Sequence, residues 1–161
     1  MPYGLEALAP SESGIADFKE CLKHLRDEQP DEALADVRRA LRTAPENPFY
    51  LSYAGLLTAL VEGKFRDAEK LCRQALSLRH NHAQLYLNLA EVYQRAGRPQ
   101  EALDVLEKGW TSAGRDHRIR QALNNFGARR NPVIPVFERS NPINYILGKC
   151  RHRLLGPKRT A

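Results

Sequence analysis

One pattern of side-chain size occurs three times along this chain of 161 residues, and it constrains the fold more than any other feature of the sequence. Each copy has a small residue, a bulkier residue four positions later and a second small residue three positions after that. The copies are Ala33, Val37 and Ala40; Ala68, Cys72 and Ala75; and Ala102, Leu106 and Gly109. Their first residues are 35 and 34 positions apart, a period typical of stacked helix pairs, so the sequence predicts a small solenoid.

A second apolar stripe precedes each copy of this pattern. The stripes are Phe18, Cys21, Leu22 and Leu25; Leu51, Ala54, Gly55 and Thr58; and Tyr86, Leu89, Ala90 and Tyr93. With the turn glycines Gly63 and Gly97, they resemble the signature of the tetratricopeptide repeat (TPR) family over about residues 14 to 114. The resemblance implies an all-α fold, a right-handed superhelix of helix-turn-helix repeats. The alternative is an ordinary helical bundle with a chance similarity.

The spacing also has a physical meaning of its own. Residues three and four positions apart share one helical face, so each helix is expected to bury one apolar stripe. In the second helix of each pair, the small residues allow the partner backbone to approach closely. Helix starts are expected at Pro30, at Asn47 with Pro48 and at Pro99, and helix ends near Gly63, Gly97 and Gly114.

The chain is expected to have three parts: an N-terminal tail (1–13), a domain of three helix pairs and a capping helix (14–127), and a basic C-terminal extension (128–161). Asp116 is placed to cap the capping helix, and Trp110 is expected to pack beneath it. In the extension, three prolines between residues 129 and 142 favour an extended segment, whose apolar residues indicate that it lies against the repeats. Residues 143–155 are spaced for an amphipathic helix with a basic face.

Charge is unevenly distributed along the chain. Residues 1–114 have a net charge of −3, whereas residues 115–161 have a net charge of +9. A basic patch is predicted at Arg129, Arg130, Lys149, Arg151 and Arg153. Such a patch would attract an acidic protein surface, nucleic acid or an anionic membrane. The open alternative is that these charges only solvate the protein or face its own acidic repeats.

Several classes of function lack the residues they need. His80 and His82 lie in a loop expected to face solvent, and no group of residues has the spacing of a zinc site or a phosphate loop, so neither a metal nor a cofactor is predicted. Three cysteines at apolar positions are expected in the core, without disulfides, which suits a reducing cytoplasm. The N-terminus resembles no export signal, and no apolar run is long enough to span a membrane. The protein is expected to be a soluble, cytoplasmic non-enzyme.

The TPR resemblance implies recognition of a peptide from another protein in a groove lined by the first helices of the pairs. By register, the groove residues are Phe49, Ser52, Leu56, Gln84, Leu87, Asn88, Glu91, Gln94, Arg118, Gln121 and Asn125. Asn88 and Arg118 are expected to be exposed and match the family's clamp for chaperone C-termini, but Ser52, Leu56 and Ala122 do not, so that clamp is incomplete.

The leading hypothesis is therefore a protein-protein interaction adaptor without a small-molecule substrate. Binding of nucleic acid or an anionic membrane through the basic extension is the alternative. A homodimer that shares the extension is possible because three repeats make a short groove.

Overall fold

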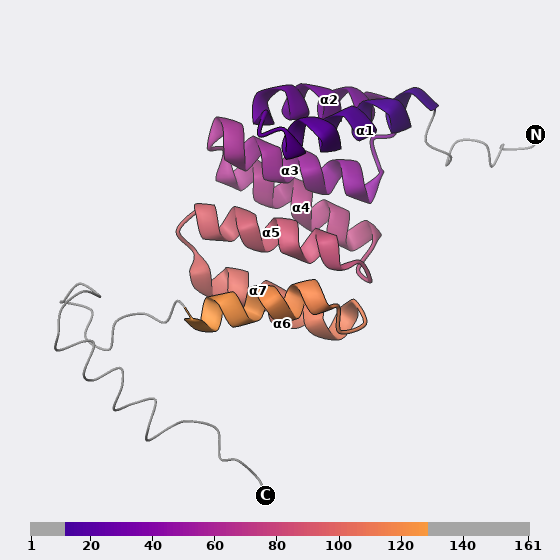
Figure 1. Ribbon diagram of the computed structural model, residues 1–161. Coiled ribbons are helices and arrows are strands. Elements are labelled where there is room, and N and C mark those ends of the chain that lie inside the picture. Colours follow the sequence, from indigo (N-terminus) through magenta and orange to yellow (C-terminus); the bar gives the residue numbers. More distant parts are fainter. Residues whose placement is uncertain (1–11, 129–161) are drawn as a thin grey trace, which may run out of the picture. The chain divides into compact units, whose positions relative to one another are not determined.

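The computed structural model describes residues 12–128, and these residues are helical apart from short connections (Figure 1). The helices are α1 (Glu12–Arg26), α2 (Pro30–Thr43), α3 (Pro48–Glu62), α4 (Phe65–Leu78), α5 (Ala83–Arg95), α6 (Pro99–Ser112) and α7 (His117–Ala128). The three predicted pairs are α1 with α2, α3 with α4, and α5 with α6, and α7 follows as the capping helix. The chain divides into two compact units between Asn124 and Asn125, and α1 to α6 all belong to the first.

The predicted boundary signals act where the sequence places them. Asn47 caps α3, because its side-chain oxygen accepts hydrogen bonds from the backbone nitrogens of Phe49 and Tyr50 at 3.0 and 3.3 Å. Asp116 caps α7 in the same way, accepting a 2.8 Å hydrogen bond from the Arg118 backbone nitrogen. Prolines occupy the first turns of α2, α3 and α6.

The turns within the pairs need a left-handed backbone. Gly63 and Gly97 supply it in the second and third pairs, with φ values of 63° and 72°. The turn of the first pair has no glycine, and Glu28 adopts the left-handed conformation instead, with a φ of 57°. In the first pair, the left-handed position of the turn is thus occupied by a residue that is less suited to it than glycine.

The small residues of the repeat pattern lie at the closest helix contacts, as predicted. Every alanine of the three triplets is fully buried. A Cβ atom on Gly55 of α3 would lie 2.6 Å from Cys72 Sγ and 2.8 Å from the Ala68 carbonyl oxygen, both on α4. On α6, a Cβ atom on Gly109 would lie 2.6 Å from Cγ of Tyr86. The pairs therefore pack at distances that only glycine and alanine permit.

The capping helix packs on the third pair. A Cβ atom on Gly109 would lie 3.1 Å from Cδ1 of Ile119, which is fully buried on α7. The Arg120 guanidinium lies 4.8 Å from the centre of the Trp110 ring, a cation-π contact between α7 and α6. The expected contact between Trp110 and the capping helix is thus present.

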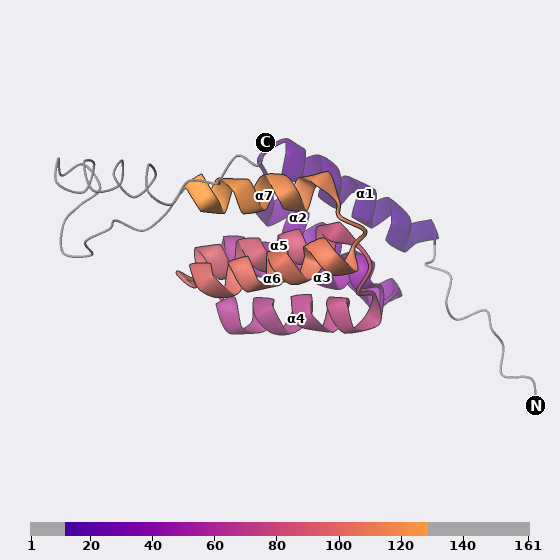
Figure 2. The same ribbon diagram turned by 90° about the horizontal axis from the view of Figure 1, so that it is seen from below.

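Contacts join α1 to α3, α3 to α5 and α5 to α7. Seen from below, α1 and α7 lie above α3 and α5, and α4 lies beneath them (Figure 2). The first helices of the pairs and the start of α7 thus follow one another through the first unit.

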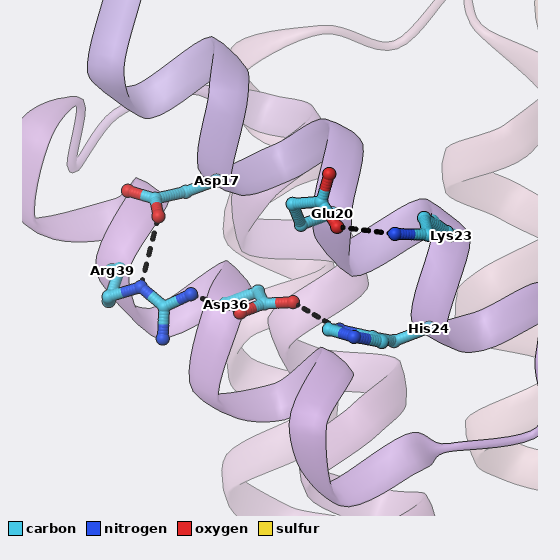
Figure 3. Close-up of polar contacts among 6 residues, drawn as sticks. All are labelled: Asp17, Glu20, Lys23, His24, Asp36 and Arg39. Atoms are coloured by element: carbon cyan, nitrogen blue, oxygen red, sulfur yellow. Dashed lines mark hydrogen bonds and ion pairs between the residues drawn. The ribbon is translucent and has the colours of Figure 1, made fainter.

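A polar network joins the two helices of the first pair (Figure 3). Asp36 of α2 is nearly buried, and its carboxylate contacts His24 Nδ1 at 2.6 Å and the Arg39 guanidinium. Arg39 also reaches back to Asp17 of α1, with 2.9 Å between Nε and Oδ1. Cys21 lies beside this network but is fully buried, and burial together with the charge of Asp36 raises the pKa of its thiol to about 12. The thiol is therefore protonated at neutral pH, unlike that of a reactive cysteine.

A second network joins the second pair to the third. Glu69 of α4 accepts hydrogen bonds from the Tyr93 hydroxyl at 2.7 Å, from Arg98 at 2.6 Å and from Arg73 at 2.8 Å. Partial burial alone would raise the pKa of this carboxyl, but the three donors outweigh that effect and lower the pKa to about 2.

Both cysteines in the described part of the chain, Cys21 and Cys72, are buried free thiols, as predicted. None of the described helices is long and apolar enough to cross a membrane. The predicted extended segment, the helix at 143–155, Cys150 and the five residues of the basic patch lie outside the described residues.

Enlarging a close-contact residue should destabilise the fold. Ala68→Leu and Ala102→Leu are each expected to lower the free energy of unfolding by about 1–3 kcal/mol, because the added atoms have no space against the preceding helix. Thermal unfolding followed by circular dichroism measures this. Ala35→Leu on the exposed side of α2 is the control and should leave the midpoint almost unchanged. Equal midpoints for all three variants would contradict the packing described here.

The Glu69 network should make stability depend on pH. Since the folded-state pKa of about 2 lies below the ordinary value of 4.5, ionised Glu69 stabilises the fold above about pH 4.5, and this stabilisation is lost as the pH falls towards 2. Glu69→Gln is expected to reduce the free energy of unfolding by about 1–2 kcal/mol at pH 7 and by much less near pH 2. Urea titrations across this range test it. Glu107→Gln, exposed on α6, should show no such trend.

Candidate functional site

The candidate site is the side of the first unit formed by α1, α3, α5 and α7. We define its inner face by the side chains that these helices leave accessible on that side: Lys19, Lys23, Arg26, Tyr53, Leu56, Gln84, Leu87, Glu91, Gln94 and Arg118. Tyr53, Leu56, Leu87 and Arg118 are half-buried, whereas the cations of α1 are exposed. The inner face therefore combines an apolar centre on α3 and α5 with charged side chains at both ends.

Burial raises the pKa of the Tyr53 hydroxyl, and the positive charge of Arg118 acts in the opposite direction.

Most of the predicted groove residues are accessible. Leu56, Gln84, Leu87, Glu91, Gln94 and Arg118 are half-buried on the inner face, and Gln121 of α7 is exposed. Asn125 is exposed as well, but it begins the second compact unit.

Two predicted groove residues are buried, contrary to expectation. Ser52 is fully buried and Asn88 is 3% exposed, because Asn88 Nδ2 donates a 3.0 Å hydrogen bond to Ser52 Oγ between α3 and α5. Asn88 in turn accepts a 2.8 Å hydrogen bond from Gln84 Nε2, and Gln84 accepts one of 3.1 Å from Arg118. We refer to Ser52, Asn88, Gln84 and Arg118 as the polar ladder. It connects α3, α5 and α7, so these polar groups stabilise the packing of the helices and are less available to a ligand.

The positive charge of Arg118 is also balanced by Asp116, the residue that caps its helix. Its guanidinium contacts both carboxylate oxygens of Asp116, at 3.1 and 2.9 Å. Hydrogen bonds from the Arg118 side chain and backbone lower the pKa of Asp116 to about 2, so the ion pair persists across the physiological range. An anionic ligand would have to displace Asp116 to use this arginine.

Phe49 lies in the packing between the second and third pairs. Its ring meets the His82 ring edge-on, with 4.7 Å between the ring centres, and the Arg79 guanidinium lies 5.4 Å from the centre of the Phe49 ring.

His82 is half-buried, not solvent-facing as predicted, and its Nδ1 has no hydrogen-bond partner in the described structure. Burial and the charge of Arg79 lower the pKa of His82, which keeps the ring neutral. His80 is exposed, as expected.

The structure adds residues of the first helix pair to the predicted groove. A hollow of about 670 Å³ lies between α1 and α3, lined by Lys19, Glu20, Leu22, Lys23, Leu25, Arg26 and Tyr53. The sequence carries a signal for it, because Lys19 follows Phe18 as Ser52 follows Leu51 and Leu87 follows Tyr86. The predicted groove omits the first pair and therefore these cations. Within residues 12–128, no cluster of three or more His, Cys, Asp or Glu side chains could hold a metal ion.

Comparison with known families identifies the repeats. The tetratricopeptide repeat family model matches residues 59–125, which run from the end of α3 into α7. The chain therefore contains tetratricopeptide repeats. The family and the all-α solenoid predicted from the spacing of small residues are thereby confirmed.

Solved TPR structures share the fold of this TPR protein. The Sgt2 TPR domain from Aspergillus fumigatus matches with a TM-score of 0.65 and 17% identity, over 95% of this chain and 89% of that one. The first TPR of Spaghetti (RPAP3), bound to an HSP90 peptide, gives 0.62 and 17%, over 74% and 97%. The TPR2B domain of yeast Sti1, in complex with an Hsp70 peptide, gives 0.63 and 17%, over 74% and 100%.

Curated relatives are longer. The beta-barrel assembly-enhancing protease of Escherichia coli strain K12 is 32% identical over 93 residues, which are 58% of this chain and 19% of the relative. The protein of the same name from Shigella flexneri gives the same values. The TPR protein therefore spans about a fifth of the length of these relatives.

The polar ladder makes Asn88 a structural residue. Asn88→Ala is expected to lower the free energy of unfolding by about 1–2 kcal/mol, because the Ser52 hydroxyl loses its buried partner. The double variant with Ser52→Ala should cost less than the sum of the two single changes. Chemical denaturation of the four proteins measures the coupling. Gln94→Ala, also on α5 but without a side-chain hydrogen bond to any of residues 12–128, is the control, and an equal loss from that change would argue against the ladder.

Proposed function

We propose that this protein is an adaptor that binds a peptide segment of another protein in a groove along the inner face. The observation that carries the proposal is the apolar centre of that face, where Tyr53, Leu56 and Leu87 are only half-buried. Half-exposed apolar side chains on a rigid surface are typical of peptide-binding sites, because a ligand gains by burying them.

The polar ladder supports the same proposal. It fixes α3, α5 and α7 relative to one another from beneath the surface, so the face requires little ordering when a ligand binds. Among proteins of similar fold, the first TPR of Spaghetti and the TPR2B domain of Sti1 were solved with chaperone peptides, which supports a peptide as the class of ligand. The chaperone tail itself is not favoured here, because Asp116 occupies Arg118 and Ser52 is buried.

The alternative, binding of nucleic acid or an anionic membrane through Arg129, Arg130, Lys149, Arg151 and Arg153, concerns residues outside the described part. The cytoplasmic location and the homodimer also stay predictions from the sequence. The proposed experiment separates the two modes of binding.

Replacement of apolar inner-face residues should remove the partner. Tagged full-length protein with Leu56→Gln and Leu87→Gln is expected to lose its partners in affinity capture from the source cell, identified by mass spectrometry. Peptides from those partners should bind this variant at least about tenfold more weakly. The matched control carries Leu76→Gln and Val105→Gln, half-buried residues of α4 and α6. Thermal midpoints of both variants establish that they are folded.

Charge reversal of the five residues of the basic patch completes the comparison. If that change removes the partners while Leu56→Gln with Leu87→Gln retains them, the basic extension is the binding surface and the proposal is wrong. Steep salt dependence of the lost binding would then indicate nucleic acid.

A further inference from the structure

The hollow between α1 and α3 has an apolar floor and a positively charged rim. Leu22, Leu25 and Tyr53 are half-buried and form the floor. Lys19, Lys23 and Arg26 are exposed and follow one another at intervals of four and three residues, so they form one stripe along α1. A volume of about 670 Å³ is sufficient for several side chains of a peptide.

The rim has a net positive charge, because Glu20 is the one acidic residue of the described part of the chain that lines the hollow beside Lys19, Lys23 and Arg26. Lys23 pairs with Glu20 at 3.2 Å, but both side chains are more than half exposed, which makes the pair weak. Neither Lys19 nor Arg26 forms an ion pair with any residue between 12 and 128. Arg39 and Arg118 differ from them, because each is held by carboxylates of its own fold.

The helix that carries the rim is firmly attached. Asp17 and His24 point towards α2, where they meet Arg39 and Asp36, whereas Glu20 and Lys23 pair with each other along α1 (Figure 3). The Phe18 ring lies 4.7 Å from that of Tyr50 and 5.3 Å from that of Tyr53. The floor and the rim are therefore positioned before any ligand arrives.

We propose that this hollow receives an acidic segment of the partner, with an apolar side chain on the floor and flanking Asp or Glu residues at Lys19, Lys23 and Arg26. The inference rests on the proposed function and specifies the chemistry of its peptide. Charge complementarity selects this occupant. The extension of this chain does not fit the hollow, because residues 129–161 contain eight Lys and Arg against one Glu and would be repelled by the rim.

Selection from a random peptide library tests the inference while the partner is unidentified. Full-length protein is used to select phage that display random dodecapeptides at low ionic strength. The enriched sequences should combine Asp or Glu with Leu, Ile, Phe or Met. Each enriched dodecapeptide is then synthesised with a fluorescein label, and its affinity is measured by fluorescence polarisation.

Charge reversal on α1 should weaken these peptides specifically. Lys19→Glu with Lys23→Glu is expected to reduce affinity about tenfold at low salt, and less at high salt. The control, Lys70→Glu with Lys108→Glu, makes the same change in net charge at exposed positions of α4 and α6 and should leave affinity within about twofold. Polyglutamate of the same length should compete poorly, because it has no apolar side chain for the floor.

The outcomes separate the two proposals. The acidic-segment inference is wrong if the selected peptides lack acidic residues, or if they bind the Lys19→Glu and Lys23→Glu variant as tightly as the unchanged protein. The proposed groove still stands in that case, provided that the same peptides bind the Leu56→Gln and Leu87→Gln variant more weakly. The inference is also wrong if the Lys70→Glu and Lys108→Glu control loses as much affinity, or if polyglutamate competes strongly. Either result would mean that the peptides are held only by non-specific electrostatic attraction. If no peptide is sensitive to either set of changes, both proposals are wrong.

Discussion

The close approach of α3 and α4 is the contact on which the other elements of the first unit depend. An added Cβ atom at Gly55 would collide with Ala68 and Cys72, so the Gly55 backbone lies directly against the Ala68 carbonyl and the Cys72 sulfur. Dispersion energy falls steeply with distance, and such contact gains attraction along the whole length of a pair. It also brings α3 into position to pack against α5, which is how one tight pair determines the placement of the next.

Polar groups between the helix pairs fix how each pair is positioned against the next. The ladder from Ser52 to Arg118 and the carboxylate of Glu69 each connect elements that are distant in sequence. Hydrogen bonds have stricter geometry than apolar contacts, so they fix the register of helices that could otherwise slide. Because the polar ladder is occupied by its own hydrogen bonds, Tyr53, Leu56 and Leu87 and the exposed cations of α1 are prominent on the accessible inner face. Recognition by such a surface relies on shape and charge more than on directional hydrogen bonds.

The sequence was sufficient to predict the helix pairs, their starts and ends, and the close contacts, because each depends on residues within one or two turns. Asn47, Asp116 and the small-residue triplets act through local geometry, which sequence spacing reports directly. Burial of Asn88 could not be read in this way, since it requires Ser52 of another pair at hydrogen-bonding distance. The same holds for Arg118, whose partner Gln84 is 34 residues away. The hollow at α1 combines residues from two pairs, and only its cations had a signal in the sequence.

The ladder also gives the repeats a fixed order. A hydroxyl on one first helix, amides on the next and a guanidinium on the third each satisfy the group before them. Insertion of an extra repeat between α4 and α5, or exchange of two repeats, would bury the Asn88 amide against a side chain that cannot pair with it. Solenoids of this kind ordinarily grow by duplication of near-identical units. In this array, the order of the helices is therefore tied to four side chains as well as to apolar packing.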